Sequence, residues 1–311
     1  SIDGLLAEAA AFVEQYEYQA AVDKFHEAYQ LEPENTLVLD SLAEVLLEIG
    51  HVDDALNLLQ RSIELKPEEG VAKYMNLGQI TTGHDAVAAF RKGIELLHKE
   101  LATKSRRGEA KTKGIRKRIV SALVAISEIY MTDLCDEDEA EQTCADCLEE
   151  ALNVDPDSWE AYQALASFRI SQQNPEDALV QLTKSYDIWK ELEPEDIDSP
   201  SYDARVAASK LFVELEAYEL GAEVLESLLE DNDEDAETWY LCAFCYSHTD
   251  IASAPECLQK AKKRLTKQNI TDPGIHKQVD DLTASVAEKL AAAGISPDAD
   301  HGRHQPEYDS D

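Results

Sequence analysis

The chain repeats a pattern of small, large and small residues that ends in proline. The first copy reads Ala21-x3-Phe25-x2-Ala28-x4-Pro33, and the second reads Ala55-x3-Leu59-x2-Ser62-x4-Pro67. Every position of the second copy follows its counterpart by the same interval, as Pro67 follows Pro33. A fixed period of this kind is the signature of repeat proteins, whose units bury their apolar faces by stacking against one another. The period therefore predicts an elongated array rather than a chain folded around one central core.

The composition indicates that helices form the units of this array. Hydrophobic residues make up 44% of the 311 residues, while Gly (12), Pro (10) and runs of Val, Ile and Thr are scarce. Ala and Leu are strong helix formers, whereas β-branched residues are typical of strands. No stretch approaches the roughly 18 apolar residues of a membrane span. We therefore expect an all-α, soluble chain.

The repeat matches a known family signature in more detail. A period of about 34 residues with the order W-x2-L-G-x2-Y, then A-x3-F, then P is typical of tetratricopeptide repeats, each of which is a helix pair. The first half of this order recurs as Leu39-x2-Leu42-Ala43-x2-Leu46 and as Trp239-x2-Cys242-Ala243-x2-Tyr246. The chain thus resembles the tetratricopeptide-repeat family, and this resemblance implies a right-handed superhelical solenoid of about seven helix pairs over residues 1–293. Residues 273–293 are expected to form a C-terminal capping helix and residues 294–311 an acidic flexible tail.

One segment, residues 99–118, departs from the acidic character of the chain. It holds nine of the 28 basic residues and only two acids, and two glycines interrupt it. We expect a mobile insertion with helical ends between repeats three and four. Its paired cations are typical of a split nuclear-import signal: Arg106, Arg107, Arg116, Lys117 and Arg118. A solvated passive loop, or a loop that competes for the acidic groove, remains an alternative.

The net charge indicates the kind of partner. With 64 acids against 28 bases the charge is -36, a field that repels nucleic acid and acidic membranes and attracts basic polypeptides. We expect a basic protein partner, no direct contact with nucleic acid or membrane, and a monomer. Six cysteines are too few for a disulfide framework in a chain of this length, which indicates a reducing compartment.

The sequence offers little for catalysis or for a cofactor. Cys144-x2-Cys147 and Cys242-x2-Cys245 allow a zinc site, but they lie far apart in the chain and coincide with small or core positions of the repeat. Packing in the core is therefore the favoured interpretation. No glycine-rich phosphate loop, His-Glu-x-x-His motif or framed nucleophile occurs. We predict no enzyme activity, no metal and no cofactor.

The resemblance implies that the first helix of each pair lines the inner wall of the array. The residues whose phase points inward are Glu14, Asp40, Glu44, Glu48, Asp133, Asp136, Glu137, Glu160, Gln163, Asp203, Glu214, Glu237, Tyr240 and Phe244. A concave wall lined with carboxylates would capture a cationic segment. Exposed ion pairs contribute only about 0.2–1 kcal/mol each, so affinity would need many of them or aromatic anchors such as Tyr240 and Phe244. Simple solvation of the surface is the alternative for any single acid.

The charge of the wall separates the possible functions. Tetratricopeptide co-chaperones that hold acidic tails need cations on this wall, which here carries Asp40, Glu44 and Glu48. The order of seven helix pairs, a basic insertion, a closing helix and an acidic tail resembles the family of assembly chaperones dedicated to large-subunit ribosomal protein number four. That resemblance implies capture of the protein's long internal loop and escort from cytoplasm to nucleus, with an import receptor as a further partner. A scaffold subunit of a larger complex, for which no particular charge is needed, is the alternative.

Overall fold

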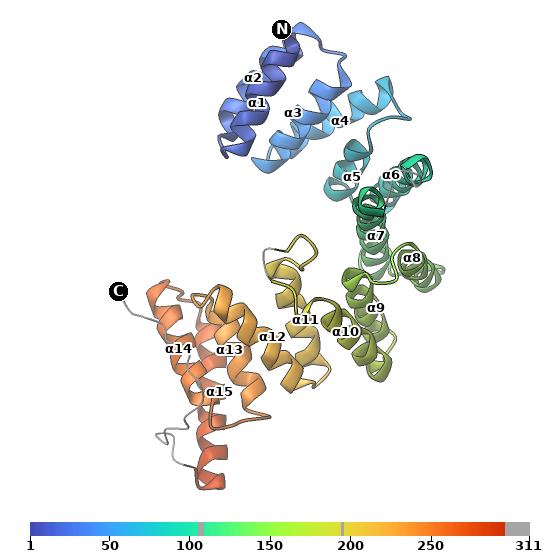
Figure 1. Cartoon of the computed structure of the whole chain (residues 1–311). Coiled ribbons are helices and arrows are strands. Elements are labelled where there is room, and N and C mark those ends of the chain that lie inside the picture. Colours follow the sequence, from blue (N-terminus) through green and yellow to red (C-terminus); the bar gives the residue numbers. More distant parts are fainter. Residues whose placement is uncertain (105–108, 194–195, 296–311) are drawn as a thin grey trace. The chain divides into compact units, whose positions relative to one another are not determined.

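The computed structural model describes residues 1–104, 109–193 and 196–295, and within these ranges it contains helices and no strands (Figure 1). It divides into two compact units, Ser1–Ala164 and Leu165–Asp311. Consecutive helices pack against each other from α1 to α8 and again from α10 to α15. The prediction of an all-α array of helix pairs is confirmed.

The first unit begins with helix pairs whose members are joined by short turns. Its helices are α1 (Ile2–Glu14), α2 (Tyr18–Leu31), α3 (Thr36–Glu48), α4 (Val52–Leu65), α5 (Val71–Ile80), α6 (Gly83–Lys104), α7 (Glu109–Met131) and α8 (Ala140–Val154). Helix α9 (Trp159–Ser171) contains the division between the units. Helix α5 has 10 residues where α1 and α3 have 13 each, so the first helix of repeat three is about one turn shorter than those of repeats one and two.

The second unit continues the same alternation. Its helices are α10 (Pro175–Trp189), α11 (Tyr202–Glu214), α12 (Tyr218–Asp231), α13 (Ala236–Tyr246), α14 (Ala254–Lys267) and α15 (Pro273–Ala293). Helix α15 packs on α14 at the end of the array (Figure 1). It begins and ends at the residues predicted for the capping helix, because Asp272 caps its first turn through the amides of Gly274 and Ile275 and Gly294 follows its end in a left-handed conformation.

The repeated prolines mark the ends of second helices, as expected. Helices α2 and α4 end at Leu31 and Leu65, each two residues before a proline, Pro33 or Pro67. Proline has no amide hydrogen and disfavours a helical residue before it, so it stops the helix at this point. The next helix starts at once, since the Asn35 side chain accepts a hydrogen bond of 3.1 Å from the Leu37 amide.

The turn inside several helix pairs uses a left-handed backbone conformation. In repeats one and two it falls on Tyr16 (φ 59°) and Gly50 (φ 80°), which occupy the same position of the repeat. In later repeats it falls on Gln173 (φ 58°) and Glu216 (φ 57°). Glycine adopts this conformation without strain, whereas Tyr, Gln and Glu do so at a cost in energy. The left-handed conformation thus recurs in these four turns, although glycine occupies the position in only one of them.

The small residues of the repeat lie where helices approach closely. Ala43 of α3 and Ala55 of α4 are completely buried, and Leu42 and Leu59 fill the space beside them. In repeat three the approach is closer still, because a side chain on Gly78 would lie 2.8 Å from the ring of Phe90. The small and large residues that define the repeat in the sequence are therefore the residues that pack where its helices meet.

The described parts of the basic segment, residues 99–104 and 109–118, are helical, where we expected a mobile insertion with helical ends. Helix α6 runs to Lys104 and α7 begins at Glu109, and the two helices pack against each other. Thr112 and Ile115 are buried, so this part of α7 packs against protein although most of its residues are charged. Helical pairing of Lys104 with Glu100 adds to the regularity.

Candidate partner-binding surfaces

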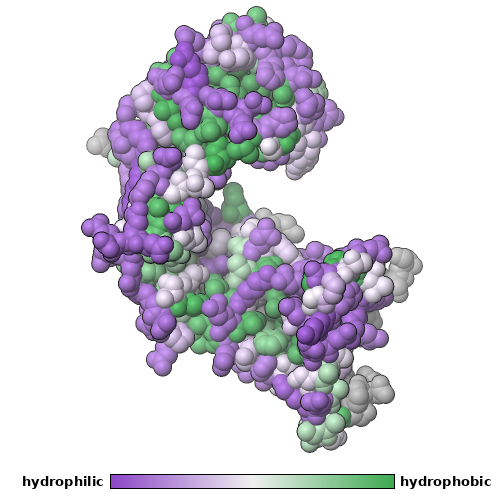
Figure 2. Space-filling model, turned by 180° about the vertical axis from the view of Figure 1, so that it is seen from behind, coloured by the Kyte–Doolittle hydropathy of each residue, from purple (hydrophilic) through white to green (hydrophobic). Residues whose placement is uncertain are grey.

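The first helix of repeat two carries three acids on one face. Asp40, Glu44 and Glu48 follow one another at intervals of four residues along α3, and Glu44 and Glu48 are exposed. Glu14 of α1 occupies the position of Glu48 one repeat earlier and is exposed as well. These carboxylates are exposed on the surface of the first unit, and the face of the molecule drawn in Figure 2 is largely hydrophilic with apolar patches. They are therefore open to a cationic partner.

Asp40 differs from its two neighbours because it points toward the next repeat. It is half-buried, and burial raises the pKa of its carboxyl, while a hydrogen bond from Ser62 and the charge of Lys73 act in the opposite direction. Lys73 of α5 is 1% exposed. Its ammonium donates to the backbone carbonyls of Ser62 (3.1 Å) and Lys66 (2.7 Å) at the C-terminal end of α4. Asp40 therefore neutralises a buried cation that caps a helix, and it belongs in part to the junction between repeats two and three.

Three predicted wall residues are not on a first helix, and this corrects their predicted placement. Helix α7 ends at Met131, so Asp133, Asp136 and Glu137 lie in the loop before α8. Asp133 accepts a hydrogen bond of 3.2 Å from the amide of Gly83, and Glu137 lies 2.6 Å from the imidazole Nε2 of His84. Both contacts place negative charge at the N-terminal end of α6, where the helix dipole favours it. The loop forms because Met131 is followed by short polar residues that compete with helix.

Helix α9 contributes a second acidic group to the first unit. Glu160 is half-buried and accepts a hydrogen bond of 2.7 Å from the hydroxyl of Ser121 on α7. Burial raises the pKa of Glu160; the hydrogen bond from Ser121 lowers it, the charge of Glu128 raises it, and Lys117 lowers it. Gln163, the other predicted wall residue of this helix, is half-buried three residues further along.

Glu128 on α7 is an acidic residue near Glu160 that the sequence analysis did not name. Burial also raises the pKa of its carboxyl, although part of the side chain remains exposed. Lys117, Ser121 and Glu128 recur at helical spacing and form a polar stripe along α7, whose residues 119–131 are mostly apolar. This stripe is the signal in the sequence that could have identified Glu128.

The second unit presents a different set of side chains. Asp203 and Glu214 of α11 are exposed. Glu237 of α13 pairs with Lys210 of α11 at 2.8 Å. Tyr240 is half-buried on α13. Burial raises the pKa of its hydroxyl, with a smaller contribution from the charge of Asp281 on α15.

Phe244 is also half-buried on α13, one turn after Tyr240. Its ring centroid is 6.0 Å from that of Tyr218 and 4.9 Å from that of His248. The predicted aromatic residues of repeat seven therefore share one helix face, and two further rings extend it.

The proposed import residues are only partly described. Arg106 and Arg107 lie outside the described residues. Arg116, Lys117 and Arg118 lie on α7, where consecutive residues point about 100° apart around the helix axis. Arg116 donates to the Thr112 hydroxyl at 2.9 Å. The three cations thus do not share one face of the helix, and their role in import remains a prediction.

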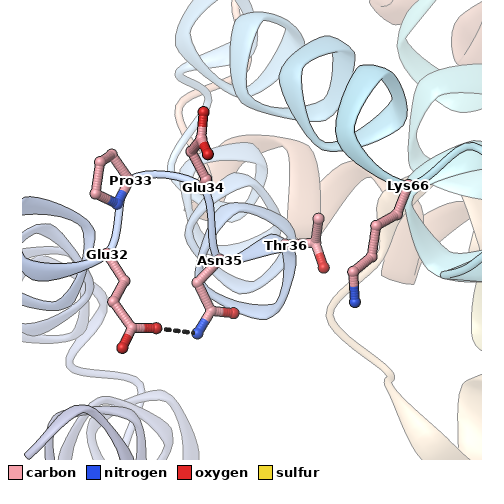
Figure 3. A pocket seen from close by; sticks show the side chains of 6 residues that line it. All are labelled: Glu32, Pro33, Glu34, Asn35, Thr36 and Lys66. Atoms are coloured by element: carbon pink, nitrogen blue, oxygen red, sulfur yellow. Dashed lines mark hydrogen bonds between the residues drawn. The ribbon is translucent and has the colours of Figure 1, made fainter.

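A shallow pocket lies away from the predicted wall residues. Six residues line its volume of about 590 Å³ (Figure 3): Glu32, Pro33, Glu34, Asn35, Thr36 and Lys66. They come from the loop between α2 and α3 and from the end of α4. Glu32 accepts a hydrogen bond of 2.9 Å from the Asn35 amide, which holds this loop together. None of the predicted partner-binding residues lines the pocket.

The cysteines lie in the packing between helices. Cys144, Cys147, Cys242 and Cys245 are buried, and burial raises the pKa of Cys144 to about 11 and that of Cys245 to about 12. Such thiols remain protonated at neutral pH and pack as small apolar groups. Among the residues that the structure describes, no group of three or more His, Cys, Asp and Glu side chains could hold a metal ion. Across the same ranges, no helix has the length and apolarity to cross a bilayer.

Comparison with known proteins defines the class of this protein. The tetratricopeptide repeat family matches residues 12–75, which include the two copies of the repeated pattern. This match identifies tetratricopeptide repeats in residues 12–75, and the helix pairs of both units continue the same fold. The solved structure of the APC/C hetero-tetramer Cut9-Hcn1 shares the fold alone, with a TM-score of 0.54 and 10% identity over 88% of this chain and 48% of that chain.

Within this class, the chain is similar to proteins that carry one particular name. "Probable assembly chaperone of rpl4" of Emericella nidulans is 31% identical over 268 residues, or 81% of this chain and 66% of that protein. The protein of the same name from Schizosaccharomyces pombe is 33% identical over 68% of this chain and 64% of its own length. This chain therefore spans about two thirds of the length of these relatives.

A solved structure supports the same relationship. The "Assembly Chaperone of RpL4 (Acl4)" superposes with a TM-score of 0.72 and 29% identity, over 80% of this chain and 96% of that chain. The predicted resemblance to the assembly chaperones is thereby confirmed. These relatives are named as chaperones, in agreement with the prediction that the chain is not an enzyme.

Proposed function

We propose that this protein is a chaperone of a large-subunit ribosomal protein, of the kind that its relatives are named for. The observation that carries the proposal is the 31% identity, over 81% of the chain, to a probable assembly chaperone of rpl4. The net charge of -36 supports it, because ribosomal proteins that bind RNA are basic. The chain would hold a basic segment of its client without catalysis.

The acids of the first helices are the proposed contacts in the first unit. Glu14, Glu44 and Glu48 are exposed, and Glu128 and Glu160 lie together on α7 and α9. A basic client segment left free would bind RNA through the release of counterions. Carboxylates that pair with its Lys and Arg side chains would prevent this contact until ribosomal RNA displaces the chaperone. We further propose that the held segment is the long internal loop and that the chain enters the nucleus with its client.

Purification of the tagged chain from cells, followed by mass spectrometry of the bound proteins, tests the proposal. We expect ribosomal protein number four of the large subunit in an amount equal to the chain. Deletion of the client's internal loop should abolish the complex. A stable set of non-ribosomal subunits in place of this protein would contradict the proposal and indicate a scaffold.

Salt and localisation provide two further measurements. Affinity for the client segment should fall as salt rises, because screening weakens exposed ion pairs over about 8–10 Å at physiological ionic strength. An affinity that is indifferent to salt would contradict the acidic surface as the site. Imaging of the chain with Arg116, Lys117 and Arg118 replaced by Ala tests the import role, and loss of the nuclear signal with an unchanged melting temperature is the expected result.

A further inference from the structure

One face of α13 carries aromatic side chains where the corresponding face of α3 carries acids. Tyr240, Phe244 and His248 recur at intervals of four residues, and His248 lies just beyond the end of the helix. Tyr240 and Phe244 are half-buried and His248 is exposed. Glu237 begins the same face, one turn before Tyr240. This face therefore combines a carboxylate with three rings that remain open to solvent.

The rings at the end of this face are held in place by contacts with one another. The imidazole of His248 stacks on the ring of Tyr218 at a centroid distance of 4.2 Å and an interplanar angle of 17°. Phe244 meets Tyr218 edge-on at 6.0 Å. The Nδ1 of His248 lies 3.0 Å from the backbone carbonyl oxygen of Phe244, which fixes the imidazole against the helix end. A rigid cluster of this kind loses little entropy when it binds a partner.

The charges around the rings indicate which partner they suit. The carboxylate charges of Glu216 and Asp281 act on Tyr218 and Tyr240, respectively. Two cations also lie at the margins of this face, but each already has a partner. Lys210 pairs with Glu237 at 2.8 Å, and the ammonium of Lys289 donates to the carbonyl of Ser247 at 3.1 Å. The field at the rings therefore favours a cationic ligand.

We propose that this aromatic face of α13, formed by Tyr240 and Phe244 and supported by Tyr218 and His248, binds arginine side chains of a basic protein segment. The inference rests on the proposed function for the identity of that segment, and it adds the side chain that the second unit selects. A guanidinium is planar and weakly hydrated, so it stacks on aromatic rings more readily than the compact ammonium of lysine. Asp281 would bind its edge through hydrogen bonds, and Glu237 would do so on exchanging its partner Lys210 for the ligand.

The test uses the full chain and two synthetic peptides of equal length and charge. One peptide carries arginine at every basic position and the other carries lysine. Isothermal titration calorimetry at low salt and at about 0.5 M NaCl measures both affinities. We expect the arginine peptide to bind about two- to five-fold more tightly. This ratio should persist at high salt, because screening weakens ion pairs and leaves stacking in place.

Substitutions assign the preference to these rings. Phe244→Leu and Tyr240→Leu should each reduce the arginine preference, whereas Tyr240→Phe should retain it because the ring remains. Tyr16→Leu removes an exposed ring from the turn between α1 and α2 and serves as the matched control, with no change expected. Melting curves by circular dichroism show whether each variant is folded, and the Tyr240 pair decides the matter if Phe244→Leu unfolds.

Two results would overturn the inference. The first is equal affinity of the unmodified chain for the two peptides, and the second is a preference that both leucine variants keep. The peptides contain no ribosomal sequence, so the result is separate from that of the proposed function. Failure to capture the ribosomal protein together with a clear arginine preference would reject the proposed function and leave this subsite standing.

Discussion

Helices α3 and α13 have the same buried frame and different exposed chemistry. Val38, Leu39, Leu42 and Ala43 are buried in α3, and the corresponding residues of α13, Thr238, Trp239, Cys242 and Ala243, are buried as well. On the open face, Asp40, Glu44 and Glu48 correspond to Tyr240, Phe244 and His248. The comparison teaches that the repeat determines which positions face outward, while each repeat has its own side chains at them.

The same comparison separates two ways to hold a basic segment. The acids of α3 attract it from a distance, and their effect depends on salt. The rings of α13 act only at contact, through stacking that salt weakens little. The following experiments break or sharpen this contrast, in order of decreasing expected effect.

The largest effect is expected at Lys73, the buried cation on which the charge of Asp40 acts. Tyr240 occupies the position of Asp40 in α13, and the described contacts show no such cation beside it. Lys73→Met should lower the free energy of unfolding by about 2–3 kcal/mol, because it removes charged hydrogen bonds to the carbonyls of Ser62 and Lys66. Chemical denaturation followed by circular dichroism measures the change. Lys263→Met, at a lysine of α14 that is not buried, is the control and should change stability little. Equal effects of the two substitutions would show that Lys73 is not a structural cation.

Reversal of the exposed acids of α3 should change binding more than folding. Glu44→Lys together with Glu48→Lys should lower the association rate of a basic client segment about tenfold at low salt, with a smaller effect at high salt. Asp40 is excluded from this variant because a lysine there would face the buried Lys73. Stopped-flow fluorescence measures the rate.

The control for this reversal is a pair of exposed acids on the second helix α8 of the same unit. Asp146→Lys together with Glu149→Lys makes the same change in net charge away from the first helices. We expect a clearly smaller loss of rate from this control. An equal loss from both variants would mean that net charge alone, and not the face of α3, attracts the client.

The turns inside the helix pairs offer a comparison of stability between the two units. Tyr16→Gly in the first unit and Glu216→Gly in the second should each raise the free energy of unfolding by up to about 1 kcal/mol, because glycine adopts a positive φ without strain. Gly50→Ala should lower it by a similar amount. Thermal melts of the three variants test the sign in each case. Destabilisation by Tyr16→Gly would show that contacts of its ring outweigh the strain.

The smallest effect is expected at Glu128, where binding and stability oppose each other. Burial raises its pKa in the folded state above the unfolded value, so ionisation opposes folding and the contribution of this group to stability falls as pH rises through the two values. Glu128→Gln should raise the melting temperature by about 1–2 °C at pH 7. The difference should shrink toward about pH 3, below the ordinary Glu pKa of about 4.3, where the carboxyl is mostly protonated in both states.

The same substitution should weaken capture of a basic segment. Calorimetry should show a loss of affinity of up to about five-fold, since Glu128 lies near Glu160 on the open side of α7 and α9. A variant that is more stable and binds equally well would remove Glu128 from the proposed contacts. Ser121→Ala tests the neighbouring hydrogen bond to Glu160 and should raise the pKa of that carboxyl further, because the bond favours its charged form.

Most of the fold could be predicted from the sequence because tetratricopeptide packing is local and periodic. The positions of Ala43, Ala55 and Leu59 in the core follow from the repeated pattern, and the limits of α15 follow from its cap and its apolar spacing. The segment 99–118 was harder, because its charged sequence hides the burial of Thr112 and Ile115. Contacts between helices stabilise this segment, and its own composition does not reveal them.

The sequence by itself determined the helix pairs, their phase, the acidity of the chain and the acids and rings on the open faces of α3 and α13. Tertiary structure alone decided which of these side chains are available to a partner. It joins Asp40 to Lys73, places Asp133 and Glu137 against the start of α6, and brings Glu128 near Glu160. The physical reason is that periodicity specifies the direction of a side chain around its own helix, whereas its neighbours, its burial and its pKa depend on the helices packed beside it.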